Sequence, residues 1–256
     1  MIGAIAGDVI GSVYEARPIK TVEFELFDPE CGFTDDTVLT IAVADFILHG
    51  GDLAEKFKTY YHLFPDRGYG GGFRQWACSS SLLPYASFGN GAAMRVSPVG
   101  FASDSLGEAM QKAKETAEVT HNHLEGIRSA QAVASCIYLA REGKSKDQIR
   151  EFIESTIGYD LSESIDSLRL NYEFDATAIG SVPEALRAFY EAESYEEAIR
   201  LAVSLGGDSD TQACIAGGIA QAYFKSIPEV IIDNTLAALD DPLIEVIIEF
   251  NMKFGL

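Results

Sequence analysis

Apolar residues recur at helical spacing along most of this chain, and this pattern constrains the fold more than any other feature. The segments 38–48, 124–141 and 146–157 repeat apolar residues at intervals of three and four, and each ends at a glycine. Alternation of apolar and polar residues, which is typical of strands, is nearly absent. The sequence therefore predicts an all-α fold, with residues 1–256 forming one compact orthogonal domain of roughly ten helices.

Composition and charge exclude several classes of protein. A chain of 256 residues with 47% hydrophobic content can bury a large core. The formal net charge of -20 argues against nucleic-acid binding through a basic surface. The four cysteines show no C-x-x-C spacing, which favours a reducing, cytoplasmic setting over a disulfide scaffold. We expect no signal peptide and no membrane span, since no basic leader or long uncharged apolar window is present.

The N-terminal segment has glycines at Gly3, Gly7 and Gly11, four residues apart. A helix with this spacing presents one smooth face for close packing, so we expect a central, buried helix. Pro18 ends that helix and leaves Glu15 near its last turn. Position alone favours a solvated terminal carboxylate at Glu15.

Two acidic clusters lie far apart in the sequence. Asp208 and Asp210 follow a glycine pair between two helical segments, and the cluster 34–37 (Thr-Asp-Asp-Thr) begins another helix. Helix capping would explain one carboxylate in the second cluster. Carboxylates packed this closely repel one another unless a cation or a proton intervenes. We therefore hypothesise that the fold brings the two clusters together around metal.

The segment 66–95 is rich in glycine and lacks helical spacing, which predicts a loop that forms a ligand wall. Its tracts 68–72 and 87–91 expose backbone N–H groups suited to phosphate, and Tyr69 or Phe88 could stack on a base. The alternative is that this segment is a connecting loop that binds no ligand. No P-loop or Rossmann glycine motif is present. His121 and His123 are two residues apart, so we expect His121 to contact ligand or cap a helix rather than bind metal.

Six motifs in order resemble the ADP-ribosylglycohydrolase family, which includes dinitrogenase reductase-activating glycohydrolases and ADP-ribosyl-serine and ADP-ribosyl-arginine hydrolases. They are GAIAGDVIGSVYEA from residue 3, the cluster 34–37, GNGAAMR from residue 89, Thr120-His121, SVPEA from residue 181 and GGDSDT from residue 206. The segment 143–175 matches no motif. The resemblance implies an all-α fold with two Mg2+ or Mn2+ ions at the floor of a cleft.

The resemblance also implies roles for individual residues. Thr34, Asp35 and Asp36 would bind metal from one side, Asp208, Asp210 and Thr211 from the other, and Glu15 would be a further ligand or a gate. The diphosphate and adenosine would be held by Gly68, Tyr69, Gly70, Gly71, Ser87, Phe88, Gly89, Asn90 and His121. Glu15, Asp35 and Asp210 are the candidate catalytic residues, because either Glu15 or a metal-bound aspartate could supply the acid or the base that glycoside hydrolysis needs.

The expected function is metal-dependent hydrolysis of the bond between ADP-ribose and an acceptor, such as a serine or arginine side chain of a protein. The wording Ser-Val-Tyr-Glu-Ala around Glu15 is closer to the serine-type enzymes. One alternative is a phosphoesterase or nucleotide pyrophosphohydrolase, since two metal ions serve phosphoryl chemistry equally well. Another is a non-catalytic ADP-ribose-binding protein. We expect a monomer whose partners are ADP-ribosylated proteins or small ADP-ribose conjugates.

Overall fold

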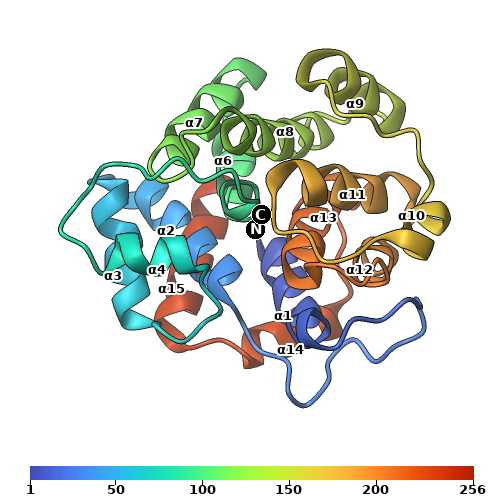
Figure 1. Cartoon of the computed structure of the whole chain (residues 1–256), viewed down its shortest axis with the longest axis horizontal. Coiled ribbons are helices and arrows are strands. Elements are labelled where there is room, and N and C mark those ends of the chain that lie inside the picture. Colours follow the sequence, from blue (N-terminus) through green and yellow to red (C-terminus); the bar gives the residue numbers. More distant parts are fainter.

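The computed structural model describes residues 1–256, and all of its regular elements are helices (Figure 1). The helices are α1 (Ile2–Ala16), α2 (Asp35–His49), α3 (Leu53–Leu63), α4 (Gly71–Ala77), α5 (Gly91–Met94), α6 (Ser97–Ala102), α7 (Leu106–Glu118), α8 (Leu124–Arg141), α9 (Lys146–Phe152), α10 (Ile165–Asn171), α11 (Ala178–Glu191), α12 (Tyr195–Val203), α13 (Ser209–Phe224), α14 (Glu229–Ala237) and α15 (Asp241–Phe254). A π-helical turn, Ile153–Ile157, extends α9. The all-α prediction is confirmed.

Helices α1 and α13 pack against each other near the middle of the molecule (Figure 1). Their backbones approach so closely that a Cβ added at Gly7 would lie 2.0 Å from the carbonyl oxygen of Ala213. A Cβ added at Gly11 would lie 2.4 Å from the carbonyl oxygen of Ser209. Only glycine permits this approach, so the expectation of a buried glycine-faced helix is confirmed, and the end of α1 meets the start of α13.

The structure has fifteen α-helices where the sequence predicted roughly ten. Two of the additional helices, α4 and α5, lie in the glycine-rich segment that we expected to be loop, and α10 lies in the unmatched connection. Helix α4 forms because Phe73 and Trp76, three residues apart, both face the core. Pro183 lies inside α11 without ending it, since burial of Val182 and Ala185 stabilises the continuous helix.

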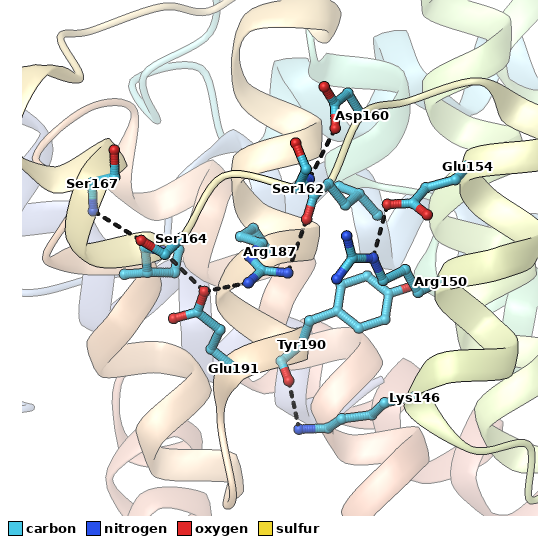
Figure 2. Close-up of polar contacts among 12 residues, drawn as sticks. Lys146, Arg150, Glu154, Asp160, Ser162, Ser164, Ser167, Arg187, Tyr190 and Glu191 are labelled. Atoms are coloured by element: carbon cyan, nitrogen blue, oxygen red, sulfur yellow. Dashed lines mark hydrogen bonds and ion pairs between the residues drawn. The ribbon is translucent and has the colours of Figure 1, made fainter.

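The connection from α9 through α10 is fastened to α11 by the contacts that Figure 2 shows. Arg187 of α11 donates to the carbonyl oxygen of Leu161 at 2.9 Å and pairs with Glu191 at 2.6 Å. Glu191 in turn accepts a hydrogen bond from the backbone N–H of Ile165 at 3.0 Å. This segment, which matched no motif, leads directly into residues that line the cleft described below.

None of the helices combines the length and the apolar character needed to cross a bilayer.

Candidate active site

Asp8 of α1 joins the first helix to the start of the second. Its carboxylate accepts hydrogen bonds from the backbone N–H of Thr34 at 3.0 Å, from the Thr34 hydroxyl at 2.7 Å and from the backbone N–H of Thr37 at 3.1 Å. The Thr37 hydroxyl donates to it as well. Burial raises the pKa of the Asp8 carboxyl, and these hydrogen bonds oppose that shift. Asp8 therefore anchors the helix start that carries the first acidic cluster.

The first acidic cluster begins α2. Thr34 is the N-cap, and its hydroxyl accepts a hydrogen bond from the backbone N–H of Asp36 at 3.3 Å. Asp36 is buried, with one carboxylate oxygen near the hydroxyl of Thr211 at 3.3 Å and the other without a hydrogen-bond partner. An unpartnered buried carboxylate oxygen is costly unless a proton or a cation neutralises it.

The second acidic cluster begins α13 after a sharp turn. Gly206 adopts a φ of 65°, a left-handed conformation that glycine adopts without strain, and this turn places Asp208 at the N-cap. The side-chain amide of Asn90 donates to Asp208 at 2.8 Å and to the Ser181 hydroxyl at 3.1 Å. Asn90 thus orients one carboxylate of this cluster from the opposite wall of the cleft.

The two clusters meet, as the sequence hypothesis required. Carboxylate oxygens of Asp8, Asp36 and Asp210 lie within 4.8 Å of one another, and so do those of Glu15, Asp208 and Asp210. Burial and the neighbouring carboxylates raise the pKa values of Asp36 and Asp210 well above the usual range. The same causes raise the pKa of Glu15, whose side chain is exposed at the mouth of the cleft.

This arrangement fits hard cations. The donors are oxygen atoms only, several are buried, and one has no other partner, which is the chemistry that Mg2+ and Mn2+ prefer. The charge of Asp35 also raises the pKa of Asp36. Burial, followed by the charges of Asp8 and Asp208, raises the pKa of Asp35 well above the usual range. The acidic residues of both clusters could therefore hold metal ions.

A cleft of about 310 Å3 opens above the carboxylates. The residues expected from the sequence that line it are Glu15, Asp35, Asp36, Gly68, Gly70, Ser87, Gly89, Asn90, His121, Asp208, Asp210 and Thr211. The acidic groups form one end, and Gly89 and Gly91 with His121 form the other wall. Gly68 lies beside the acidic end, since a Cβ added there would be 3.3 Å from Oδ1 of Asp35. Sequence segments more than a hundred residues apart thus contribute to one concave surface.

Four residues that we expected in the site do not line the cleft. The ring of Tyr69 is buried and stacks against Phe73, so Tyr69 does not face a ligand, contrary to one of the two stacking options. Gly71 is the first residue of α4 and does not line the cleft. Thr34 is not among the lining residues, and its hydroxyl donates to Asp8. Phe88 is exposed beside the rim, with its ring 5.9 Å from that of His123.

The sequence reasoning missed several residues at this site. Asp8 lies seven residues before Glu15, two helical turns away on the same side of α1, and that spacing was the available signal. Tyr85 and Arg95 lie in the segment that we expected to form a ligand wall, but neither was singled out, and Phe174 lies in the unmatched connection without any signal.

Comparison with known proteins agrees with this geometry. Residues 1–252 match the model of the ADP-ribosylglycohydrolase family. The ADP-ribosylhydrolase ARH3 of Bos taurus is 27% identical over 90% of this chain and 85% of its own length. The human ADP-ribosylhydrolase ARH3 is 26% identical over 90% of this chain and 86% of its own length.

A solved structure described as an ADP-ribosylglycohydrolase-related protein complex has the same fold, with a TM-score of 0.70 and 24% sequence identity. The similarity covers 93% of this chain and 95% of that one. Because the family match extends over nearly the whole sequence, this chain belongs to the ADP-ribosylglycohydrolase family and is a hydrolase that acts on ADP-ribose conjugates.

Proposed function

We propose that this enzyme hydrolyses the glycosidic bond between ADP-ribose and the side chain of a modified protein, releasing free ADP-ribose. The observation that carries the proposal is the meeting of acidic residues from α1, α2 and α13 at one end of a cleft whose other wall is glycine-rich backbone. Such an asymmetric site suits a ligand with a sugar at one end and a diphosphate next to it.

Two Mg2+ or Mn2+ ions would be held by the two acidic clusters, with Asp35, Asp36, Asp208 and Asp210 as carboxylate ligands. Thr34 and Thr211 would add hydroxyl oxygens, and Glu15 would be a further ligand or a gate. When bound, such ions attract neighbouring ribose hydroxyls and lower the pKa of a water molecule. The unpartnered oxygen of Asp36 is the feature of this chain that most favours metal.

Glu15 is the residue best placed to transfer protons. It is exposed at the cleft mouth on the last turn of α1, next to the carboxylates but not enclosed by them. Partial burial of the carboxyl, followed by the charges of Asp208 and Asp8, raises its pKa, which is the direction of shift that an acid–base group needs. Asp35 and Asp210 would take part in proton transfer only as ligands of the metal ions.

The opposite wall would bind the remainder of ADP-ribose. Gly70 and Gly89 present backbone to the cleft without side chains, which suits close approach of phosphate oxygens. Gly68 does the same beside Asp35, where the diphosphate would be nearest to the acidic end. The exposed ring of Phe88 at the rim is the candidate for stacking on adenine, since Tyr69 is buried. We favour a serine-linked acceptor, because the wording Ser-Val-Tyr-Glu-Ala around Glu15 is closer to the serine-type enzymes. We also propose that the enzyme acts as a monomer.

The test is a panel of serine-linked, arginine-linked and polymeric ADP-ribose substrates, assayed with Mg2+ or Mn2+ and with a chelator. Wild-type protein should release ADP-ribose and unmodified acceptor only with metal. Glu15→Gln should lower kcat by about a hundredfold or more while metal still binds, because general acid–base catalysis contributes that much. Glu23→Gln is the matched control, since Glu23 is exposed in the following loop and lines no part of the cleft.

Three results would contradict the proposal. Full activity of Glu15→Gln with metal bound would remove the proton-transfer role. Release of AMP and ribose phosphate would identify a phosphoesterase instead. Binding of ADP-ribose without release of any acceptor would identify a binding protein that lacks turnover.

A further inference from the structure

Arg95 is a buried cation in the same wall of the cleft as His121. It follows α5, is 1% exposed, and its guanidinium lies 4.2 Å from the centre of the Phe57 ring. Its Nη2 donates to the carbonyl oxygen of Thr116 at 3.2 Å and to the hydroxyl oxygen of Thr120 at 2.7 Å. Because a guanidinium has donors and no acceptor, the Thr120 oxygen must accept in this contact.

The direction of the next hydrogen bond follows from the first. The Thr120 hydroxyl is fully buried, and its other partner is the Nδ1 atom of His121 at 2.7 Å. The hydroxyl has one hydrogen to donate, and Nδ1 is the only acceptor that it contacts, since its other partner is the Arg95 donor. If Nδ1 also donated, this buried hydrogen would have no partner. Nδ1 of His121 is therefore unprotonated, and the ring proton of the neutral imidazole is on Nε2.

The packing of His121 fixes where this Nε2–H lies. Gly126 supports the ring from behind, since a Cβ there would lie 2.7 Å from the His121 Cβ. The Nε2 and Cε1 atoms lie against Gly91, where an added Cβ would be 3.1 Å from both. His121, Gly89 and Gly91 all line the cleft. Burial, and then the charge of Arg95, hold the pKa of His121 well below its usual range, so the ring stays neutral at pH 7.

We propose that Arg95 and Thr120 are positioning residues that fix His121 as the neutral Nε2–H tautomer, so that it presents one hydrogen-bond donor to a ligand oxygen in the cleft. The identity of that ligand as a nucleoside diphosphate sugar rests on the proposed function. The hydrogen bonds from Arg95 through Thr120 to His121 do not rest on the proposed function, because all of these contacts lie within this protein. Without the Thr120 hydroxyl, either ring nitrogen could carry the proton.

The test is a long-range 1H–15N correlation spectrum of the imidazole rings in 15N-labelled protein. The chain has four histidines, and the signal of His121 is assigned by its loss in His121→Asn. Wild-type protein should show the Nε2–H pattern. Thr120→Val, which removes the hydroxyl and keeps the shape, should show a mixture of tautomers and bind ADP-ribose about five- to tenfold more weakly, the effect of losing one oriented hydrogen bond.

Two variants separate this effect from a general loss of packing. Thr120→Ser keeps the hydroxyl and should restore both the wild-type spectrum and the affinity. Thr116→Val removes a buried hydroxyl that bonds only to the carbonyl oxygen of Ala113, and leaves intact the Thr116 carbonyl that Arg95 contacts. It should leave the His121 spectrum unchanged. A change at Arg95 would also remove its packing on Phe57, so the test uses the threonine variants instead.

The outcomes distinguish this proposal from the proposed function. A Nδ1–H or doubly protonated His121 in the wild type, or an unchanged spectrum in Thr120→Val, overturns the positioning roles whatever the protein binds. The predicted spectra in a protein that binds no ADP-ribose with Mg2+ or Mn2+ supplied support the positioning roles and contradict the proposed function. The predicted spectra with equal ADP-ribose affinity in wild type and Thr120→Val refute the donation to ligand.

Discussion

Replacing Gly7 by alanine tests whether the close approach of α1 and α13 holds the site together. The added Cβ would lie 2.0 Å from the carbonyl oxygen of Ala213 and 2.4 Å from its carbonyl carbon. Non-bonded heavy atoms pack at about 3.5 Å, so the helices would have to separate by more than about 1 Å. Because the contact is with backbone and not with a flexible side chain, no rotamer change can relieve it.

The expected loss of folding stability in Gly7→Ala follows from two opposing effects. Overpacking of this kind costs about 3 kcal/mol, the upper end of the usual range, and alanine regains about 1 kcal/mol of helix propensity over glycine. The net destabilisation of about 2 kcal/mol corresponds to a fall in Tm of about 4–8 °C for a chain of this length. The matched control is Gly107→Ala in α7, where Gly107 is exposed and no atom lies near the added Cβ. That variant should be as stable as the wild type or more stable.

Thermal and urea unfolding followed by circular dichroism measure both variants. Gly7→Ala should also bind Mn2+ more weakly, since moving α13 displaces Asp210 relative to Asp36 without changing either residue. If Gly7→Ala is as stable as Gly107→Ala, the two helix backbones are not in contact and the packing argument is wrong. If stability falls while metal affinity is unchanged, the contact is real but does not set the spacing of the carboxylates.

Two further predictions concern titration. The pKa values of Asp36 and Asp210 are raised in the folded protein. These carboxyl groups therefore contribute stability below their unfolded pKa, and that stability is lost as the pH rises through their folded pKa. Metal-free protein should become less stable above about pH 4. Added Mg2+ should reverse that loss at neutral pH, and equal Tm values with Mg2+ and with chelator would contradict it. Glu184 of α11 has a pKa raised by burial to about 7, so Glu184→Gln should raise Tm at about pH 8 and change it little at about pH 4. A Tm difference that does not vary with pH would show that Glu184 is not a buried titrating group.

The helical part of the fold was predictable because its signals are local. The apolar spacing of 124–141 predicted α8 as it stands, and the three glycines of α1 predicted a close helix contact. The short helix α4 was missed because its glycine-rich start contradicts helix propensity, and only the burial of Phe73 and Trp76 outweighs that. Local pattern thus predicts long helices well and short, core-supported helices poorly.

The acidic part of the site was predictable for a different reason. Asp208 and Asp210 stand out in the sequence because clustered carboxylates need a structural or chemical explanation. Asp8 belongs to no such cluster, and its only signal in the sequence is its spacing from Glu15. Its contacts with Thr34 and Thr37 are visible only in the folded structure. Tyr69 and Phe88 were equivalent as stacking candidates until packing buried one and left the other exposed.

The two sides of the cleft differ in how firmly the fold holds them. The acidic end rests on α1 and α13, whose backbones touch at glycines and cannot shift without a steric clash. Carboxylates that repel one another need such a rigid support, because a flexible one would let them separate. The opposite wall contains exposed residues on short connections, such as Gly70 and Phe174. Neither of these two residues has a hydrogen bond to an acidic residue, whereas Asn90 of the same wall holds Asp208. Differences in acceptor selectivity within this fold should therefore arise from exposed wall residues such as Gly70 and Phe174 and not from the carboxylates.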